Sequence, residues 1–158
     1  MRLSSQEEYG LRCLIRVGRE GTEGSVTMPE LARSEGISQP HVAKMMRLLL
    51  KGGFVKSTRG QSGGYTLARP ADQIAVGHVL AVLGGRLFDS NFCGTHTGAA
   101  NLCTHMGDCA IRSVWRTIQE AIDGVLARLT LKDVLVSEQE MNVWASGRPI
   151  LPTYTHNA

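Results

Sequence analysis

Three cysteines lie close together in the second half of the chain and could bind a metal through sulfur. Cys93, Cys103 and Cys109 are separated by nine and five residues, and His96 and His105 lie between them. Thiolates that are grouped in one loop can converge on a soft metal centre. Their spacing differs from the paired Cys-x-x-Cys pattern of most structural zinc sites. The three thiolates indicate zinc or an iron–sulfur cluster, and a cluster needs a fourth ligand from elsewhere.

Other reactive roles for the cysteines find little support in the sequence. The fourth cysteine, Cys13, lies in an apolar helical pattern, where we expect a small buried hydrophobic side chain. Free cysteines in a chain without a signal peptide favour metal binding or redox chemistry over structural disulfides. No set of nucleophile, base and orienting residue is visible. The sequence therefore predicts that the protein is not an enzyme.

Length and composition indicate one soluble globular unit. The chain has 158 residues, of which 42% are hydrophobic and 20% charged, enough for a core. It has no apolar run near the roughly 18 residues that a membrane span needs, and its start does not resemble a signal peptide. We expect a cytoplasmic protein with no membrane contact.

The positive charge is concentrated in the first half of the chain. Residues 1–75 carry 11 Lys and Arg against 7 Asp and Glu, whereas residues 76–158 carry 6 against 7. No acidic residue occurs between Gly36 and Ala71. A basic face suggests a polyanionic partner, although a solvated surface would show the same charges.

Two short helices joined by a tight turn are predicted over residues 28–35 and 39–51. Thr27 and Glu30 have capping-box spacing, Gly36 ends the first helix, and Ser38 begins the second. This pattern is typical of a helix-turn-helix, whose second helix reads DNA. The residues expected to contact double-stranded DNA from this helix are Ser38, Gln39, His41, Lys44 and Arg47.

A β-hairpin is predicted directly after the helix-turn-helix. Residues 54–57 and 65–67 read as strands, and Arg59-Gly60-Gln61-Ser62-Gly63-Gly64 lies between them. Gly60, Gly63 and Gly64 allow a close approach to a phosphate backbone, and Arg59 lies beside them. The fold class is therefore mainly α with a small hairpin wing: a winged helix-turn-helix.

A long helix from Cys109 to about Leu129 carries an apolar seam. The seam residues are spaced by three or four and include Ile111, Val114, Ile118, Ile122 and Val125. An identical helix from a second subunit would cover them, which predicts a homodimer, whereas packing on the chain's own domain is the alternative. The expected divisions are a DNA-binding domain over 1–75, a short helix and cysteine loop over 76–108, a dimerisation and exit region over 109–136, and a flexible tail over 137–158.

These motifs together resemble the winged-helix iron–sulfur transcription regulators that include IscR, NsrR and RirA. The resemblance is carried by Met1-Arg2-Leu3-Ser4, Gly36-Ile37-Ser38, the stretch from Arg59 to Leu67, Ile74-Ala75-Val76-Gly77, the three cysteines and Leu129 to Val134. It covers about residues 1–136. It implies a homodimeric repressor that binds a pseudo-palindromic operator. Each subunit would hold one 2Fe-2S or 4Fe-4S cluster, through which the protein would sense redox state, nitric oxide or iron supply.

Two departures from the family pattern bear on the fourth cluster ligand. The gap between Cys93 and Cys103 is nine residues instead of the usual five, and Arg112 stands where the IscR type has a ligand histidine. The NsrR-like pattern instead implies a carboxylate near the start of the first helix, which is Glu8 here. Ser4–Glu7 and Ser5–Glu8 both fit a capping box, so Glu8 is either a cap partner or a cluster ligand. Glu7, His96 and His105 are the reserve ligands, and a structural zinc or a thiol switch without a cluster is the alternative function.

Overall fold

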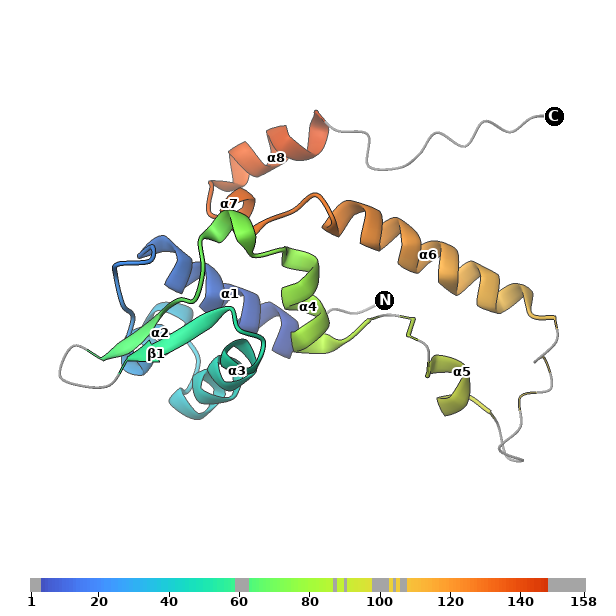
Figure 1. The fold of residues 1–158 in the computed structure, drawn as a ribbon, viewed down its shortest axis with the longest axis horizontal. Coiled ribbons are helices and arrows are strands. Elements are labelled where there is room, and N and C mark those ends of the chain that lie inside the picture. Colours follow the sequence, from blue (N-terminus) through green and yellow to red (C-terminus); the bar gives the residue numbers. More distant parts are fainter. Residues whose placement is uncertain are drawn as a thin grey trace.

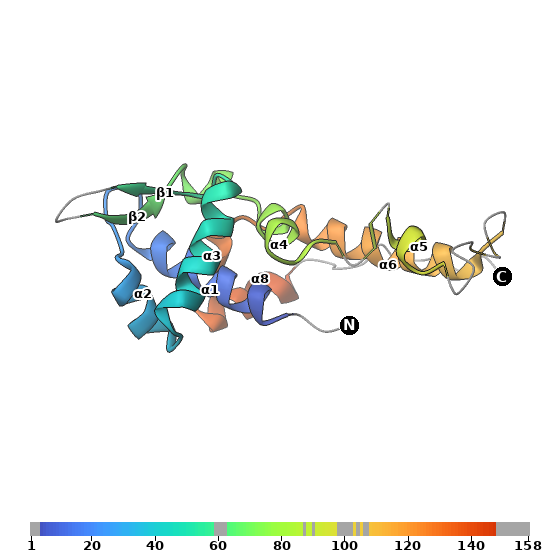
Figure 2. The ribbon, with the colours of Figure 1, turned by 90° about the horizontal axis from the view of Figure 1, so that it is seen from below.

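The winged helix forms a body from which one helix and the cysteine loop extend as an arm. The computed structural model describes residues 4–58, 63–86, 88–89, 91–97, 103, 105 and 108–147. In Figure 1, α1, α2, α3 and the hairpin lie at one end, and α6 with the short α5 runs outward from it. Figure 2 shows the same division from below. No helix among the described residues is long and apolar enough to cross a membrane.

Helix α1 (Ser5–Arg19) begins at a capping box and runs through the centre of the body. Glu7 N–H bonds to Ser4 Oγ at 3.3 Å, and Ser4 N–H donates to Glu7 Oε2 at 2.8 Å. Of the two overlapping capping boxes in the sequence, the first is therefore formed, and Glu8 is not the cap partner. Cys13, Leu14 and Val17 are fully buried, as the prediction for Cys13 required.

The helix-turn-helix agrees with its predicted bounds. Helix α2 (Met28–Glu35) starts at a Thr27–Glu30 capping box and ends at Gly36, whose φ of 65° is left-handed and favours glycine. Helix α3 (Gln39–Lys51) has Ser38 at its N-cap position, but the Ser38 side chain makes no capping hydrogen bond. The core side of α3 consists of Val42, Met45, Met46 and Leu49.

The wing is a two-stranded antiparallel sheet of β1 (Val55–Thr58) and β2 (Gly64–Leu67). Val55 pairs with Leu67, and Thr58 pairs with Gly64. Phe54, expected in the first strand, lies just before it and is fully buried. The paired residues Val55 and Leu67 are both part of the hydrophobic core, which ties the base of the wing to the helices.

The arm leaves and rejoins the body at one place. A short 3₁₀ turn (Ala71–Gln73) leads into α4 (Val76–Gly84), and the chain returns through α7 (Leu131–Val134). Leu131 N–H donates to the Ile74 carbonyl at 2.7 Å, and Val76 N–H donates to the Leu129 carbonyl at 2.9 Å. Leu131 is fully buried, so the return point is anchored in the core.

Within the arm, α5 (Phe92–Thr95) lies beside the outer part of α6 (Ala110–Leu126). The long helix is thus shorter at both ends than predicted, and α5 was not expected. A further unexpected helix, α8 (Glu138–Ser146), occupies the start of the supposed tail. It begins at a Ser137–Glu140 capping box, whose hydrogen bonds lower the pKa of the Glu140 carboxyl. The rest of the tail, 148–158, lies outside the described residues.

Candidate DNA-binding surface and cysteine loop

The first turns of α3 present the side chains that were predicted to contact DNA. Ser38, Gln39, His41, Lys44 and Arg47 are all exposed, because the apolar residues between them face the core. The ring of His41 makes an edge contact with Tyr9 of α1, with the centroids 6.1 Å apart. Helix α1 thus supports α3 from behind and leaves the outer face of α3 open.

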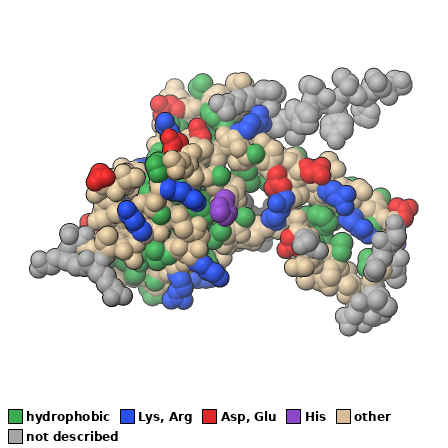
Figure 3. All heavy atoms as spheres, viewed as in Figure 1, with side chains coloured by type: hydrophobic (Ala, Val, Ile, Leu, Met, Phe, Trp, Pro, Cys, Tyr) green, Lys and Arg blue, Asp and Glu red, His purple; other side chains and the backbone are tan. Residues whose placement is uncertain are grey.

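Positive charge continues from α3 onto the wing. Lys44, Arg47, Lys51 and Lys56 are exposed, and the stretch from Gly36 to Ala71 adds no carboxylate. In Figure 3, Lys and Arg side chains spread over the lower and central part of the body, while acidic side chains gather near its upper edge. Such a surface attracts a phosphate backbone.

The wing tip is only partly described. Arg59 and Gly60 lie outside the described residues, and Gly63 and Gly64 lie at the turn end of the wing, where Gly64 pairs with Thr58. A Cβ at Gly64 would stand 2.9 Å from the Val26 carbonyl oxygen, closer than side chains normally approach. This glycine therefore has a packing reason, because Val26 and Tyr65 exchange backbone hydrogen bonds there.

The three cysteines of the loop are half-buried and occupy different settings. Cys93 lies in α5, and Cys109 is the N-cap of α6. Cys103 belongs to the segment that connects α5 to α6 in the sequence. Cys109 Sγ accepts a hydrogen bond from Arg112 N–H at 3.4 Å.

The loop is fastened to α6 at several points. Near its beginning, Phe88 N–H donates to Gln119 Oε1 at 3.0 Å. The Phe92 ring lies 6.4 Å from the Trp115 ring, centroid to centroid. Near its end, Arg112 Nη2 donates to the His105 carbonyl at 3.3 Å. Both ends of the cysteine loop are thus held on one helix.

The described residues contain no group of three or more Cys, His, Asp and Glu side chains placed to hold a metal ion. The donor chemistry of the loop nevertheless fits a soft metal, because all three sulfurs are partly exposed and belong to one segment fastened to α6.

The candidates for the fourth ligand differ in what they already bind. Glu7 is engaged in the α1 capping box, whereas Glu8 is exposed and takes no part in it. His96 Nδ1 lies 2.8 Å from the Phe92 carbonyl oxygen, and its ring stacks on Phe92. In the tautomer with the proton on Nδ1, this nitrogen donates to the Phe92 carbonyl and the Nε2 lone pair can bind a metal; Thr95 Oγ1 lies 3.0 Å from the same Nδ1. His105 is exposed.

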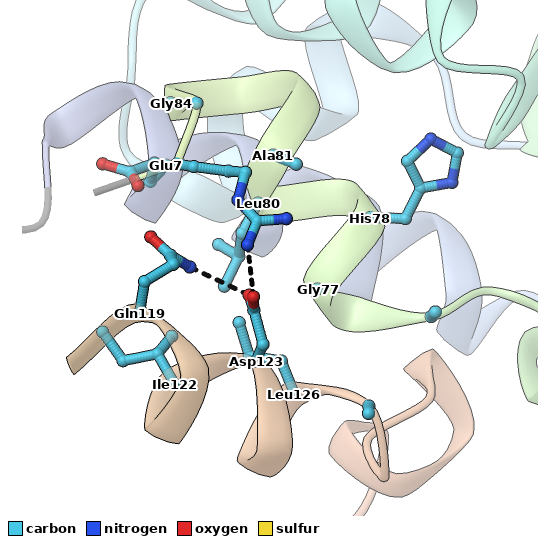
Figure 4. Close-up of a pocket in the computed structure, with 14 residues that line it drawn as sticks. Glu7, Gly77, His78, Leu80, Ala81, Gly84, Gln119, Ile122, Asp123 and Leu126 are labelled. Carbon is cyan, nitrogen blue, oxygen red and sulfur yellow. Dashed lines mark hydrogen bonds and ion pairs between the residues drawn. The ribbon is translucent and has the colours of Figure 1, made fainter. Parts of the chain in front are cut away.

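A cavity of about 760 Å³ separates α4 from α6. Its walls include Gly77, Leu80 and Ala81 of α4 and Ile122 and Leu126 of α6, and Glu7 reaches it from α1 (Figure 4). Across it, Arg86 pairs with Asp123, which also accepts a hydrogen bond from Gln119. Nothing in the spacing of Arg86, Gln119 and Asp123 marks these three polar residues in the sequence.

The buried cysteine should behave differently from the other three. Burial raises the pKa of the Cys13 thiol to about 11, with a further increase from Glu35 and an opposing effect from Arg12. At pH 8 only about one thousandth of it is thiolate, the reactive form. We expect iodoacetamide to label Cys93, Cys103 and Cys109 of the folded, metal-free protein but not Cys13, as measured by peptide mass spectrometry.

In urea, where burial is lost, all four cysteines should react. Rapid labelling of Cys13 in the folded protein would contradict its position in the core.

A helix-turn-helix with a two-stranded wing and an exposed basic face defines a winged-helix regulator of transcription. The chain belongs to the Rrf2 family: a family profile described as an iron-dependent transcriptional regulator matches residues 3–137. Its relatives are named as transcriptional regulators, so the protein is not an enzyme. The predicted family and fold class are confirmed.

The relatives span most of the chain. The HTH-type transcriptional regulator IscR of Serratia proteamaculans is 32% identical over 145 residues, which cover 92% of this chain and 85% of that protein. The solved structure of T. potens IscR has a TM-score of 0.66 at 31% identity and covers 85% of this chain and 86% of its own. That of CymR, described as the global cysteine regulator of B. subtilis, has a TM-score of 0.64 at 25% identity, covering 85% and 96%.

Proposed function

We propose that the protein is a homodimeric repressor whose affinity for a pseudo-palindromic operator is switched by an iron–sulfur cluster, one per subunit. Redox state, nitric oxide or iron supply would be the signal. The observation that carries the proposal is the arm: one helix holds both ends of a three-cysteine loop and also exposes an apolar seam. Helix α6 would therefore both support the metal site and form the contact between subunits.

The exposed residues support a dimer. Ile111 and Val114 are 63% and 54% exposed, although they are apolar, whereas the polar Gln119 is 6% exposed. A single chain thus buries a polar side chain of α6 and leaves apolar ones in water, which is unfavourable unless a partner covers them. Because Ile111 and Val114 are exposed, these two residues do not support the alternative that the seam packs on the chain's own domain. The remaining seam residues, Ile118, Ile122 and Val125, are half-buried.

DNA contact is proposed through α3 and the wing. Gln39 and His41 at the start of α3 would reach base edges in the major groove, and Lys44 and Arg47 would contact phosphates. Arg59, Gly60, Gly63 and Gly64 would approach the backbone from the wing. A dimer would place two α3 helices in successive half-sites.

Cys93, Cys103 and Cys109 are the proposed thiolate ligands, and Glu8 is the proposed fourth. When bound, an iron–sulfur cluster supplies a centre that reacts with oxidants or nitric oxide. A carboxylate oxygen suits such a centre less well than a thiolate does, so Glu8 would be the labile ligand. Helix α1 packs on α3. Release of Glu8 would therefore free the DNA-binding body relative to the arm and change the spacing of the α3 helices.

One observation favours a second candidate, a regulator with a structural zinc and no cluster. The open Nε2 of His96, with Nδ1 held by the Phe92 carbonyl, is the arrangement common for a metal-binding histidine. Three cysteines and this histidine would form a Cys₃His zinc site. The four side chains all belong to the arm.

Anaerobic purification followed by an absorption spectrum and iron, sulfide and zinc analysis separates the two candidates. The proposed function predicts a coloured protein with iron and sulfide, and operator affinity that changes at least severalfold when the cluster is removed. A colourless, zinc-loaded protein would select the second candidate. Cluster loading without any change in DNA affinity would contradict the switch.

Phosphate contacts make the DNA interaction sensitive to salt. We expect Lys44→Ala and Arg59→Ala each to lower affinity for all DNA sequences about equally and to reduce the slope of log K against log salt by about 1. Fluorescence anisotropy with operator and unrelated duplexes over a salt series measures this.

Lys132→Ala is the matched control, since Lys132 is exposed on α7 outside the helix-turn-helix and the wing. An unchanged salt slope in both test variants would show that α3 and the wing do not contact DNA as proposed.

A further inference from the structure

A polar network centred on the buried Gln119 joins the beginning of the cysteine loop to α6. We infer that Gln119 is the positioning residue that sets where Cys93 lies; this inference rests on the proposed metal site. All residues of α6 are described, and Gln119 is the only one of them that is buried. A buried amide is costly unless both its oxygen and its nitrogen are hydrogen-bonded. Its partners therefore explain its position.

Both halves of the Gln119 amide are matched to their partners. Oε1 accepts from Phe88 N–H at 3.0 Å, and Nε2 donates to Asp123 Oδ1 at 2.9 Å. The other Asp123 oxygen pairs with Arg86 (Figure 4). A backbone N–H only donates and a carboxylate only accepts, so the orientation of the amide is fixed. Glutamate in its place would face Asp123 with a second carboxylate, and leucine would leave the Phe88 N–H unbonded.

From Phe88 a short chain of contacts leads to Cys93. The Phe88 ring lies 5.2 Å from the Phe92 ring, centroid to centroid, and Phe92 immediately precedes Cys93. Phe92 also contacts Trp115, one turn of α6 before Gln119. Gln119 and Trp115 thus hold the start of the loop and α5 against a single helix.

The other end of the same helix carries a second ligand. Cys109 is the N-cap of α6, so its sulfur is fixed relative to the helix axis. With Gln119 fixing Phe88, two of the three thiolates are positioned on one rigid element before a metal arrives. Outer partners of this kind typically change metal affinity 10- to 100-fold.

The test uses Co²⁺ alone, added to metal-free protein under anaerobic conditions and followed by its thiolate charge-transfer absorption. We expect Gln119→Ala to weaken Co²⁺ binding roughly 10-fold. Glu120→Ala is the matched control: it changes the neighbouring, exposed residue of the same helix to the same amino acid and should leave affinity unchanged. Hydrogen exchange at the Phe88 amide should accelerate only in the first variant.

A rescue separates positioning from a general loss of structure. The single change Gln119→Glu should weaken Co²⁺ binding, and adding Asp123→Asn should restore it, because the hydrogen bond then runs in the opposite direction. Equal Co²⁺ affinity in wild type and Gln119→Ala, a rescue that fails, or a wild type that binds no Co²⁺ would each overturn the inference. A wild type that binds Co²⁺ but never assembles an iron–sulfur cluster would refute the proposed function and leave this inference standing.

Discussion

Ile118→Asp is expected to convert the proposed dimer to monomers at micromolar concentration and to abolish operator binding. The substitution places a charge from each subunit in the apolar seam of α6, where it has no partner. A loss of about 3 kcal/mol corresponds to a dimer dissociation constant raised about 100-fold. Sedimentation velocity over a concentration series measures the change, with or without DNA.

Val143→Asp provides the matched control for this prediction. Val143 is apolar, lies on α8 and is 69% exposed, so the same change should leave the dimer intact. Circular dichroism distinguishes dissociation from unfolding, because the winged-helix core does not include Ile118. A wild-type protein that sediments as a monomer at micromolar concentration would refute the proposed homodimer directly.

Removal of the proposed cluster ligands should have different results for the cysteines and for Glu8. Cys93→Ala, Cys103→Ala and Cys109→Ala should each abolish the cluster, since three thiolates supply most of its bonds. Glu8→Ala should keep a cluster with an altered spectrum and faster loss in air, and operator affinity should no longer follow cluster state. Anaerobic absorption spectra and DNA titrations on the same samples measure both effects.

Two control variants make the assignment of Glu8 specific. Glu7→Ala removes the capping-box partner one residue away and should cost about 1 kcal/mol of stability without changing the spectrum. Cys13→Ala should retain the cluster, because Cys13 is in the core. A normal spectrum with normal switching in Glu8→Ala would transfer the role to His96, His105 or Glu7. The spectra of His96→Ala, His105→Ala and Glu7→Ala then decide among them.

The sequence predicted most of the winged helix because its signals are local. Thr27, Glu30 and Gly36 define α2 through contacts within a few residues, and the structure has the same bounds. The N-terminal capping box required a choice between Ser4–Glu7 and Ser5–Glu8 that spacing alone could not make. Helix α8 carries the same signal at Ser137 and Glu140, and the prediction of a tail overlooked it.

The arm was less accessible to prediction because its contacts join distant residues. Arg86 and Asp123 are 37 positions apart, and Phe88 meets Gln119 across 31. In the sequence, Gln119 reads as an ordinary polar residue beside the apolar seam. Gln119 is buried because Phe88, far from it in the sequence, lies against α6. Residues 86–108 show no periodicity from which this contact could be predicted.

The closure of the arm at its base has a consequence for how its length can vary. Ala75 pairs with Thr130, and Leu131 is buried in the core. The segment between Ala75 and Thr130 is therefore a long loop whose two ends are both fixed to the winged helix. The entropy of closing a flexible loop grows slowly, by about 0.6 kcal/mol for each doubling of its length. The gap between Cys93 and Cys103 is four residues longer than the family's usual five. These four residues lengthen the closed loop by much less than a factor of two. Insertions in this loop can therefore alter the reach of the cysteines while the winged helix keeps its stability.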